Sequence, residues 1–403
     1  MLYLVSLKMK PHKKNQCDYF IEIFDSHCNE IDNHTLLQEI IENRKSFISN
    51  QLGKSNTGNL ADLFSTQAAK DIIGKQPSLT LPKHYFLIEQ VALRLFGCLL
   101  SCWTELEIFR TIKNSALSNA HITNTSHSYS SQVINEHYHY EIVADIALDT
   151  RLFHTEFCEQ PLLLSDAIVL INIATFIKEH QWYEMLGMLN ISSRGEHFIL
   201  YQFNDNNPFP KIISSALINT PSISRNWLFF DDFFQGSKWQ PIHQSHSILN
   251  LKCATKISTI LSKSQLMNKS SNSLEKRIFS SILEQEKVCE AIRLTVSGSK
   301  SKANFYLYLA QKGLANALKQ SGRDVVFTII EKPAMVLFYQ SMNIETPTTS
   351  PYLFTSKQDI NRNGVVTYKG IWLLNNATLA FNQYNFKEYN VKIIRLRKLL
   401  RNN

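Results

Sequence analysis

The most informative stretch of the chain covers residues 290–342 and reads EAIRLTVSGSKSKANFYLYLAQKGLANALKQSGRDVVFTIIEKPAMVLFYQSM. Bulky residues alternate through Val288–Val296 and an apolar run fills Val325–Ile330, so both segments are predicted strands. Residues 304–320 carry apolar side chains at helical spacing, and residues 333–342 begin with a proline, which suits the first turn of a helix. This order of elements predicts two parallel, neighbouring strands in an α/β sheet.

Parallel strands that diverge have a specific chemical use. Their backbone N–H and C=O groups stay unpaired in the gap, where the extended arm of a thioester can lie between the strands. A thioester carbonyl held there meets backbone donors that stabilise its tetrahedral oxyanion. This arrangement is typical of an acetyltransferase-like (GNAT) core, and residues 334–342 (AMVLFYQSM) resemble a helix of that superfamily. An ordinary doubly wound α/β domain is the alternative interpretation of the pattern.

The rest of the sequence divides around this unit. Strand patterns recur at residues 19–24, 197–203, 211–218, 365–374 and 379–384, and helical patterns at residues 35–52, 59–73, 83–115 and 165–188. We expect residues 1–53 to form the first strand and helix of the acetyltransferase-like core, residues 54–195 to form a mostly helical insertion, and residues 196–403 to form the remainder of the core. The expected fold is therefore α/β, a mixed sheet with flanking helices that is interrupted by this insertion.

Composition indicates a globular protein of the cytoplasm. The 403 residues are 44% hydrophobic and 19% charged, which is enough to build a large core. The most apolar segment, residues 84–103, is interrupted by polar residues and does not suit a membrane span. Lys8 and Lys10 break the short N-terminal apolar run that a secretory signal needs. The seven cysteines include no CxxC pair. We expect a cytoplasmic protein with no integral membrane segment.

The formal net charge of +8 raises the question of nucleic-acid binding. The basic surplus is spread along the chain apart from residues 252–302 and 392–401, and no helix-turn-helix, RNP or zinc-finger pattern accompanies it. A basic face suits a phosphopantetheine thioester, or an acidic carrier protein that bears one, equally well. A basic nucleic-acid-binding regulatory protein is the non-enzymatic alternative.

Several segments resemble the LuxI-type acyl-homoserine lactone synthases. Residues 290–296 (EAIRLTV) are similar to their E-x-x-R-F-x-V strand, and residues 327–337 to their T-V-V-x-x-x-M-x-x-L segment. Residues 19–53, 197–220 and 227–234 resemble further elements of that family in the same order. The long extra segment points to the divergent AinS/LuxM-type autoinducer synthases of vibrios, which perform the same chemistry.

This resemblance implies an acyltransferase that makes a quorum-sensing signal. Such an enzyme transfers an acyl chain from a carrier-protein or CoA thioester to the amine of S-adenosylmethionine, whose carboxylate then displaces methylthioadenosine and closes the lactone. The implied co-substrates are S-adenosylmethionine and the acyl thioester, and the implied partner is an acyl carrier protein or acyl-CoA. No cofactor is expected. Another acetyltransferase-like N-acyltransferase that uses acyl-CoA is the leading alternative, although residues 297–300 (SGSK) lack the Q/R-x-x-G-x-G/A loop usual in such enzymes.

Glu290 and Arg293 are the expected catalytic residues. Attack on a thioester requires a neutral amine, and Glu290 is the candidate for the base that accepts its proton or for the group that orients this base. Arg293 follows three residues later and would point to the opposite face of an ideal strand. A bulge between them would let the two charges pair. A purely structural ion pair is the alternative.

The resemblance assigns an acyl-chain pocket to Thr328, Ile329, Met335 and Phe338. In the resembling family a threonine at this place faces the acyl chain and can read an oxygen on its third carbon. For Thr328 the alternative is a strand-favouring residue that bonds to a neighbouring strand. For the three apolar residues the alternative is ordinary core packing.

S-adenosylmethionine is expected to contact Arg44, Phe47, Trp227 and Phe234. An arginine can bind its carboxylate through two hydrogen bonds, and aromatic rings can stack on its adenine or sulfonium; a solvated arginine and core aromatic residues are the alternatives. The family's acidic run after the first helix and its third-strand arginine are absent, since KSNTG follows Gly53 and residues 214–216 are SSA. We therefore expect the insertion to rebuild part of this site.

No metal site is expected. The loop histidines that suggest one lack cysteine or carboxylate neighbours at ligand spacing. These histidines are His121, His127, His137 and His139.

Overall fold

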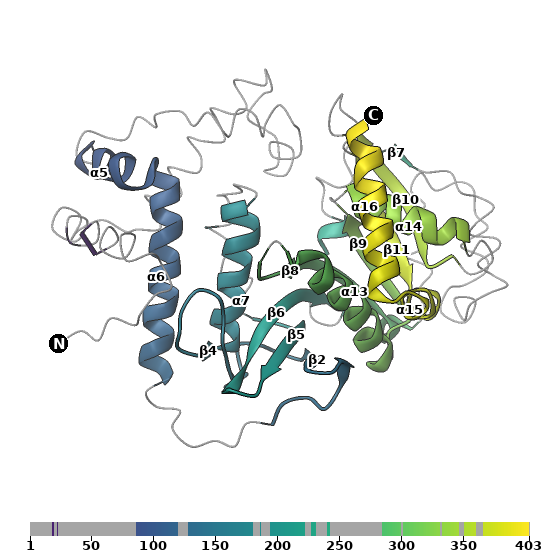
Figure 1. The fold of residues 1–403 in the computed structure, drawn as a ribbon, viewed down its shortest axis with the longest axis horizontal. Coiled ribbons are helices and arrows are strands. Elements are labelled where there is room, and N and C mark those ends of the chain that lie inside the picture. Colours follow the sequence, from purple (N-terminus) through teal and green to yellow (C-terminus); the bar gives the residue numbers. More distant parts are fainter. Residues whose placement is uncertain are drawn as a thin grey trace.

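The centre of the fold is a large mixed sheet (Figure 1). The computed structural model describes residues 18–19, 22, 86–119, 128–179, 186, 194–221, 227–230, 240–241, 284–299, 301–330, 333–345, 350–359 and 366–402. Within these residues the sheet has nine strands in the order β1-β2-β5-β6-β8-β9-β11-β10-β7. Every neighbouring pair is antiparallel except β8 and β9, which are parallel. The strands are β1 (Val133–Asn135), β2 (Tyr138–Val143), β5 (His197–Asn204), β6 (Asn207–Asn219), β7 (Gln240–Pro241), β8 (Val288–Val296), β9 (Val325–Ile330), β10 (Tyr352–Asp359) and β11 (Val366–Leu373).

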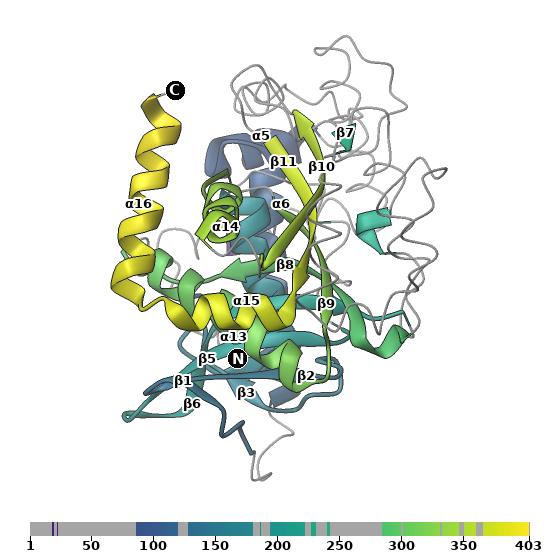
Figure 2. The same ribbon diagram turned by 90° about the vertical axis from the view of Figure 1, so that its right-hand side faces the viewer.

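Helices lie on both faces of this sheet (Figures 1 and 2). One group consists of α5 (Phe86–Phe96), α6 (Leu99–Asn119), α7 (Leu164–Asn172) and the π-helix η2 (Ile173–Glu179). The other consists of α13 (Ala303–Gln320), α14 (Pro333–Glu345), α15 (Leu374–Gln383) and α16 (Phe386–Asn402). Because side chains alternate along a strand, Ile199 and Tyr201 of β5 pack with the first group, while Phe198 and Leu200 pack with the second. A short separate ladder joins β3 (Leu152–Phe153) to β4 (Leu162–Leu163).

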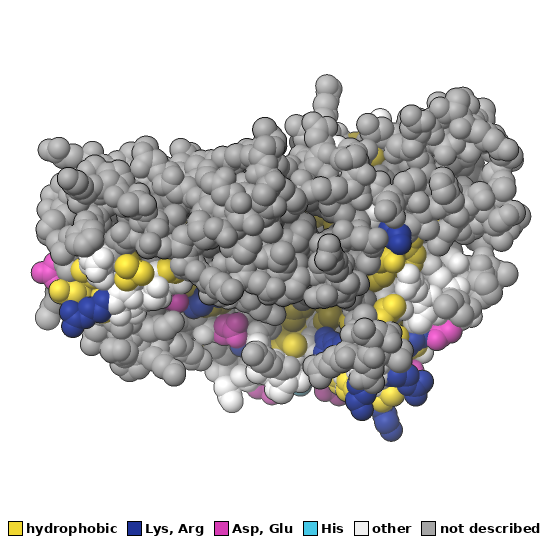
Figure 3. Space-filling view, turned by 90° about the horizontal axis from the view of Figure 1, so that it is seen from above, with side chains coloured by type: hydrophobic (Ala, Val, Ile, Leu, Met, Phe, Trp, Pro, Cys, Tyr) yellow, Lys and Arg dark blue, Asp and Glu magenta, His cyan; other side chains and the backbone are white. Residues whose placement is uncertain are grey.

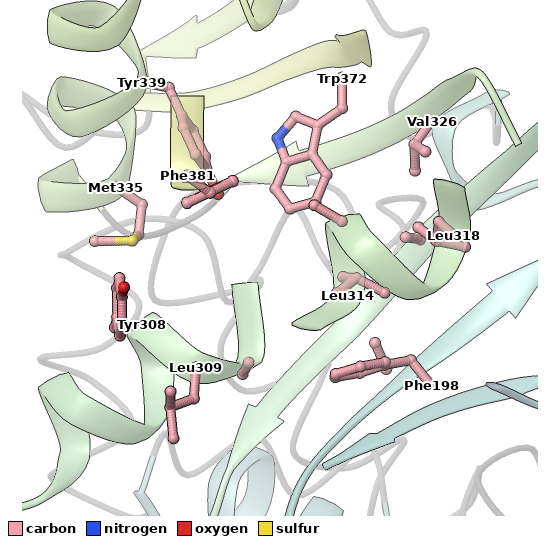
Figure 4. Packing of buried hydrophobic residues seen from close by; sticks show 14 of the residues in the cluster. Phe198, Tyr308, Leu309, Leu314, Leu318, Val326, Met335, Tyr339, Trp372 and Phe381 are labelled. Atoms are coloured by element: carbon pink, nitrogen blue, oxygen red, sulfur yellow. The ribbon is translucent and has the colours of Figure 1, made fainter. Parts of the chain in front are cut away.

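The connection from β8 to β9 is built by α13 and ends in a helix stop that the sequence encodes. Leu309, Leu314 and Leu318 of α13 are buried in the core of the second group, which Figure 4 shows from close by. Full burial of each leucine contributes about 1.5–3 kcal/mol. After the helix, Gly322 adopts a φ of +82°, and the N–H of Arg323 donates to the carbonyl of Leu318 at 3.0 Å. This left-handed turn directs the chain into β9 alongside β8.

The predicted strand–helix–strand–helix unit is confirmed. Its strands have the predicted bounds, Val288–Val296 and Val325–Ile330, while its first helix begins one residue earlier, at Ala303, and its second extends to Glu345. The predicted strands at residues 197–203 and 211–218 are confirmed as the hairpin β5–β6, and that at residues 365–374 as β11. The described part of the chain is therefore an α/β protein with flanking helices.

Two local predictions are wrong. Residues 379–384 were expected as a strand but belong largely to α15, because Phe381 and two alanines near it are buried at helical spacing. A strand was also expected at residues 19–24, but the described residues there, Tyr19 and Glu22, are helical. A short alternating apolar run does not by itself distinguish a strand from a helical turn.

The segment expected as a mostly helical insertion, residues 54–195, contains strands as well as helices. Its predicted helix at residues 83–115 is divided into α5 and α6 at Gly97, which has a φ of +81°. β1 and β2 extend the main sheet, since β2 pairs with β5 from Tyr138↔Gln202 to Val143↔His197. This part of the segment belongs structurally to the sheet.

A partly buried polar network ties this edge of the sheet together. Arg151 donates to Glu141 Oε1 at 2.6 Å and to Asp149 Oδ2 at 2.7 Å. The hydroxyl of Tyr201 donates to the same oxygen of Glu141 at 2.9 Å. Burial, assisted by the charge of Glu141, raises the pKa of Tyr201 above its usual value. The tyrosine therefore stays protonated and remains a hydrogen-bond donor.

Candidate functional site

The two parallel strands separate part-way along their length. β8 and β9 pair only at Val288↔Val325, Cys289↔Val326 and Glu290↔Phe327. Beyond this point β8 continues to Val296 along β6, and β9 continues to Ile330 along β11. The strands are thus not joined throughout, and the predicted divergence is confirmed. It begins directly after Glu290.

A bulge follows Glu290 on β8. Pairing with β6 shifts between Leu217↔Ile292 and Ser215↔Thr295, so that β8 holds one residue more than β6 over this stretch. Arg293 lies inside the bulge and adopts a φ of +57°. A left-handed backbone costs a non-glycine residue about 1 kcal/mol or more. The bulge that would bring the charges of Glu290 and Arg293 together is therefore present.

Electrostatic coupling joins the two expected catalytic residues. Burial lowers the pKa of Arg293, and the charge of Glu290 opposes that change. Burial also raises the pKa of Glu290, and the charge of Arg293 is among the effects that oppose it. The two side chains thus stabilise each other's ionised form within a largely dehydrated site.

The carboxylate of Glu290 already accepts three hydrogen bonds. Its Oε1 accepts the N–H of Phe229 at 2.6 Å, and its Oε2 accepts the N–H of Leu228 at 3.2 Å and the Nδ2 of Asn219 at 2.8 Å. The residue is completely buried. Two of these donors belong to the 3-10 helix η4 (Leu228–Phe230), so Glu290 fixes the start of this short element.

The segment 227–230, here named the aromatic turn, lies over β9. The ring centroid of Phe327 is 5.5 Å from that of Trp227, 4.9 Å from that of Phe229 and 5.5 Å from that of Phe230. On its other side, Lys369 of β11 donates to the carbonyl of Phe229 at 3.2 Å, with its Nζ 4.6 Å from the ring of that residue. The aromatic turn is therefore held by Glu290 and Lys369 from strands on either side of β9.

Lys369 was not identified from the sequence. It is only 1% exposed, although burying an ammonium group is costly without compensating contacts. The available signal was a single lysine in the otherwise apolar second half of β11, whose sequence is VTYKGIWL. Its neighbour Gly370 pairs with Thr328 of β9, which places the lysine beside the diverging strands.

The residues expected to form the acyl-chain pocket lie on both faces of the sheet. Thr328 faces the second helix group, where its hydroxyl lies 3.0 Å from that of Tyr352. Met335 and Phe338 of α14 belong to the core on this same side. Ile329 instead packs on the opposite face, in the cluster that contains Trp227. The structure therefore brings three of the four residues to one face and places Ile329 on the other.

Of the residues expected to contact S-adenosylmethionine, Trp227 is described and lies in the aromatic turn at 2% exposure. Arg44, Phe47 and Phe234 lie outside the described residues. Their assignment stays a prediction.

The histidines considered for a metal site are partly described. His121 and His127 lie outside the described residues, whereas Nδ1 of His139 lies 2.9 Å from the carbonyl oxygen of Ser130 and its ring stacks on Tyr201. Within the described ranges, no group of three or more histidine, cysteine, aspartate or glutamate residues is placed to hold a metal ion.

The surface view in Figure 3 bears on the charge of the molecule. On this face, the described Lys and Arg side chains form separate small groups beside apolar and acidic side chains. Of the described helices, none combines the length and apolar character that crossing a membrane requires.

Comparison with known proteins decides the family. Residues 15–402 match the acyl homoserine lactone synthase family. The chain belongs to this family. It is 32% identical to the acyl-homoserine-lactone synthase LuxM of Vibrio atlanticus (strain LGP32) over 329 residues, which cover 81% of this chain and 80% of that protein. It is 29% identical to LuxM of Vibrio harveyi over 388 residues, covering 95% of this chain and 92% of the relative.

A further relative is the acyl-homoserine-lactone synthase OpaM of Vibrio parahaemolyticus, 29% identical over 367 residues, or 89% of this chain and 87% of OpaM. No solved structure matches the chain. Synthases of this family are acyltransferases, so the protein is an enzyme of this class that serves autoinducer synthesis. The resemblance to the LuxM-type synthases is thereby confirmed.

Proposed function

We propose that this acyltransferase acylates the amine of S-adenosylmethionine with a chain drawn from a carrier-protein or CoA thioester, and that the product closes to an acyl-homoserine lactone. The observation that carries the proposal is the separation of β8 from β9 directly after Glu290. Diverging parallel strands offer backbone donors to a thioester carbonyl, which is the central feature of an acetyltransferase-like core. We assign the sheet to that fold on this ground.

The proposed first step forms an amide and releases a thiol. The amine nitrogen attacks the thioester carbon, and backbone N–H groups at the divergence stabilise the oxyanion that forms. The intermediate then expels the thiolate, which takes up the proton lost by the amine. In the second step the carboxylate attacks the carbon bound to sulfur, and methylthioadenosine leaves as a neutral thioether.

Glu290 takes the orienting role in this scheme. Three N–H donors already occupy its carboxylate, two of them from the backbone of Leu228 and Phe229. It therefore positions the aromatic turn and holds Arg293 in its ionised form. Arg293 supplies a positive charge for the α-carboxylate, in addition to the predicted contact with Arg44. Thr328, Met335 and Phe338 are the proposed wall of the acyl chain on the face that they share.

The test is product formation by the purified enzyme. We expect S-adenosylmethionine and an acyl thioester together to give an acyl-homoserine lactone and methylthioadenosine in equal amounts, detected by mass spectrometry. Arg293→Ala, purified as a folded protein, is expected to form neither. Parallel reactions with acyl carrier protein and CoA thioesters identify the donor. Acyl transfer to another amine without lactone would instead support the alternative N-acyltransferase, and the absence of any transfer would refute the proposal.

A further inference from the structure

His197 is a buried histidine that begins β5 (His197–Asn204). His197 is only 2% exposed, and its Nδ1 lies 3.0 Å from the carbonyl oxygen of Gly195. A carbonyl oxygen only accepts hydrogen bonds, so Nδ1 carries the proton. In the neutral imidazole Nε2 then carries a lone pair. Among the described residues, none forms a hydrogen bond with Nε2.

The sheet places this acceptor on the face that holds the catalytic candidates. His197 pairs with Leu217 of β6, which in turn pairs with Ile292 of β8, so these three side chains share one face. Asn219, two residues along β6 and on the same face, pairs with Glu290. The imidazole and the carboxylate therefore occupy adjacent rows of one face, within two residues of each other along the strands.

Arg293 acts electrostatically on both groups. It follows Ile292 in the bulge, and its charge acts on His197 as well as on Glu290. Burial, reinforced by this charge, lowers the pKa of His197 to about 4. The imidazole is therefore neutral near pH 7, and Nε2 stays a hydrogen-bond acceptor. The hydrogen bond to Gly195 and, to a smaller extent, the charge of Asp145 in the loop after β2 oppose this shift without reversing it.

A cation and a neutral acceptor near one face of the sheet match an amino acid. The α-carbon of an amino acid bears a carboxylate, which requires a cation, and an amine, which requires an acceptor. Arg293 offers the cation. The carboxylate of Glu290 already accepts hydrogen bonds from Asn219 and from the aromatic turn. On this face the lone pair of His197 is an acceptor that those contacts do not use.

We propose that His197 binds the α-amino group of the sulfonium amino-acid substrate through Nε2, while Arg293 binds the α-carboxylate. This inference rests on the proposed function, which supplies an amino acid as acyl acceptor. The contact orients the nitrogen before its attack on the thioester. His197 is thus a substrate-binding residue. Its loss weakens the binding of the amino-acid substrate and leaves the binding of the acyl donor unchanged.

Two substitutions separate this role from a structural one. His197→Asn keeps an N–H donor near the position of Nδ1, so the bond to the Gly195 carbonyl survives, but it removes the acceptor at Nε2. His197→Gln places an amide oxygen near the position of Nε2. A hydrogen bond to a charged group corresponds to about a tenfold to hundredfold change in binding. We expect His197→Asn to raise the KM for S-adenosylmethionine by about this factor and to leave the KM for the acyl thioester unchanged.

His197→Gln is expected to recover most of the affinity for S-adenosylmethionine, and both variants should melt near the wild-type temperature. A KM for S-adenosylmethionine within about twofold of wild type in His197→Asn would overturn the assignment. Equal losses for both co-substrates in both variants, with a lowered melting temperature, would also overturn it in favour of a structural role. Lactone formation by the wild-type enzyme tests the proposed function separately. If the wild type makes lactone and the variants have the same KM for S-adenosylmethionine as the wild type, only the His197 assignment fails.

Discussion

Replacement of Glu290 by glutamine tests how the site is held together. A glutamine side chain has one acceptor oxygen where the carboxylate has two. If that oxygen keeps the N–H of Phe229, 2.6 Å away in the wild type, the new NH2 group faces the donors that contact Oε2. Asn219 can rotate its amide and present its oxygen instead. The N–H of Leu228 belongs to the backbone and has no such remedy.

The expected cost follows from this one unsatisfied donor. A hydrogen bond to a charged group contributes about 1.5–3 kcal/mol, and an unsatisfied buried N–H adds a penalty of similar size. Glutamine is neutral, however, and avoids the cost of burying a charge, which in the wild type raises the pKa of Glu290. We therefore expect Glu290→Gln to loosen the aromatic turn by about 1–3 kcal/mol net.

Hydrogen exchange of the Leu228 and Phe229 amides measures this effect. A loss of about 1–3 kcal/mol corresponds to exchange about 5- to 150-fold faster, because each 1.4 kcal/mol is a factor of ten. We also expect lactone formation to be lost while the fold remains intact, since Arg293 loses its counter-charge. Both readouts are needed, because either alone would also follow from general destabilisation.

Glu141→Gln is the matched control. Glu141 of β2 is a partly buried carboxylate of the same sheet, and it accepts hydrogen bonds from Arg151 and from Tyr201 of β5. Its replacement should lower stability without changing exchange in the aromatic turn or lactone formation. The reasoning about Glu290 is refuted if a well-folded Glu290→Gln exchanges these amides, and forms lactone, at wild-type rates.

Three further outcomes are expected. Thr328→Val should mainly change the preference among acyl donors, and an unchanged donor profile would count against a pocket role. It also removes the 3.0 Å contact between the hydroxyls of Thr328 and Tyr352, at a cost of about 1 kcal/mol. Gly370→Ala should lower the free energy of unfolding, measured in urea, by about 3 kcal/mol, because the new Cβ would lie 2.5 Å from the carbonyl oxygen of Leu353. A loss under about 1 kcal/mol would show that β10 and β11 can move apart. The pKa of His197 is about 4 in the folded protein against 6.5 in the unfolded chain, so the unfolded chain binds the proton first as the pH falls. About 3 kcal/mol of stability that is present above pH 6.5 should therefore be lost as the pH falls to 4. His197→Asn should lack this loss.

Local patterns predicted the part of the site that lies within one stretch of chain. The strands β8 and β9 and the helix between them follow from short-range apolar spacing and a glycine stop at residue 322. The bulge could also be anticipated, because two charges three residues apart cannot share a face of a regular strand. The sequence thus contained both the divergence and its charged residues.

The partners of those residues depend on strand register, which local patterns do not contain. The N–H of Phe229 reaches Glu290 across 61 positions of sequence, and Lys369 reaches Phe229 across 140. His197 joins the same face only because β5 and β8 flank β6. The resemblance assigns Ile329 and Thr328 to one pocket, yet adjacent residues of a strand place their side chains on opposite faces, as these two do in β9.

The left-handed conformation of Arg293 has a consequence for how the protein tolerates change. Glycine would adopt this backbone without the steric penalty that arginine incurs, so the local backbone conformation favours the substitution. The buried charge of Glu290 and the proposed contact with substrate favour the guanidinium. A library of variants sorted for signal production should therefore retain arginine at this position, and glycine should be better tolerated in a library sorted only for resistance to heat.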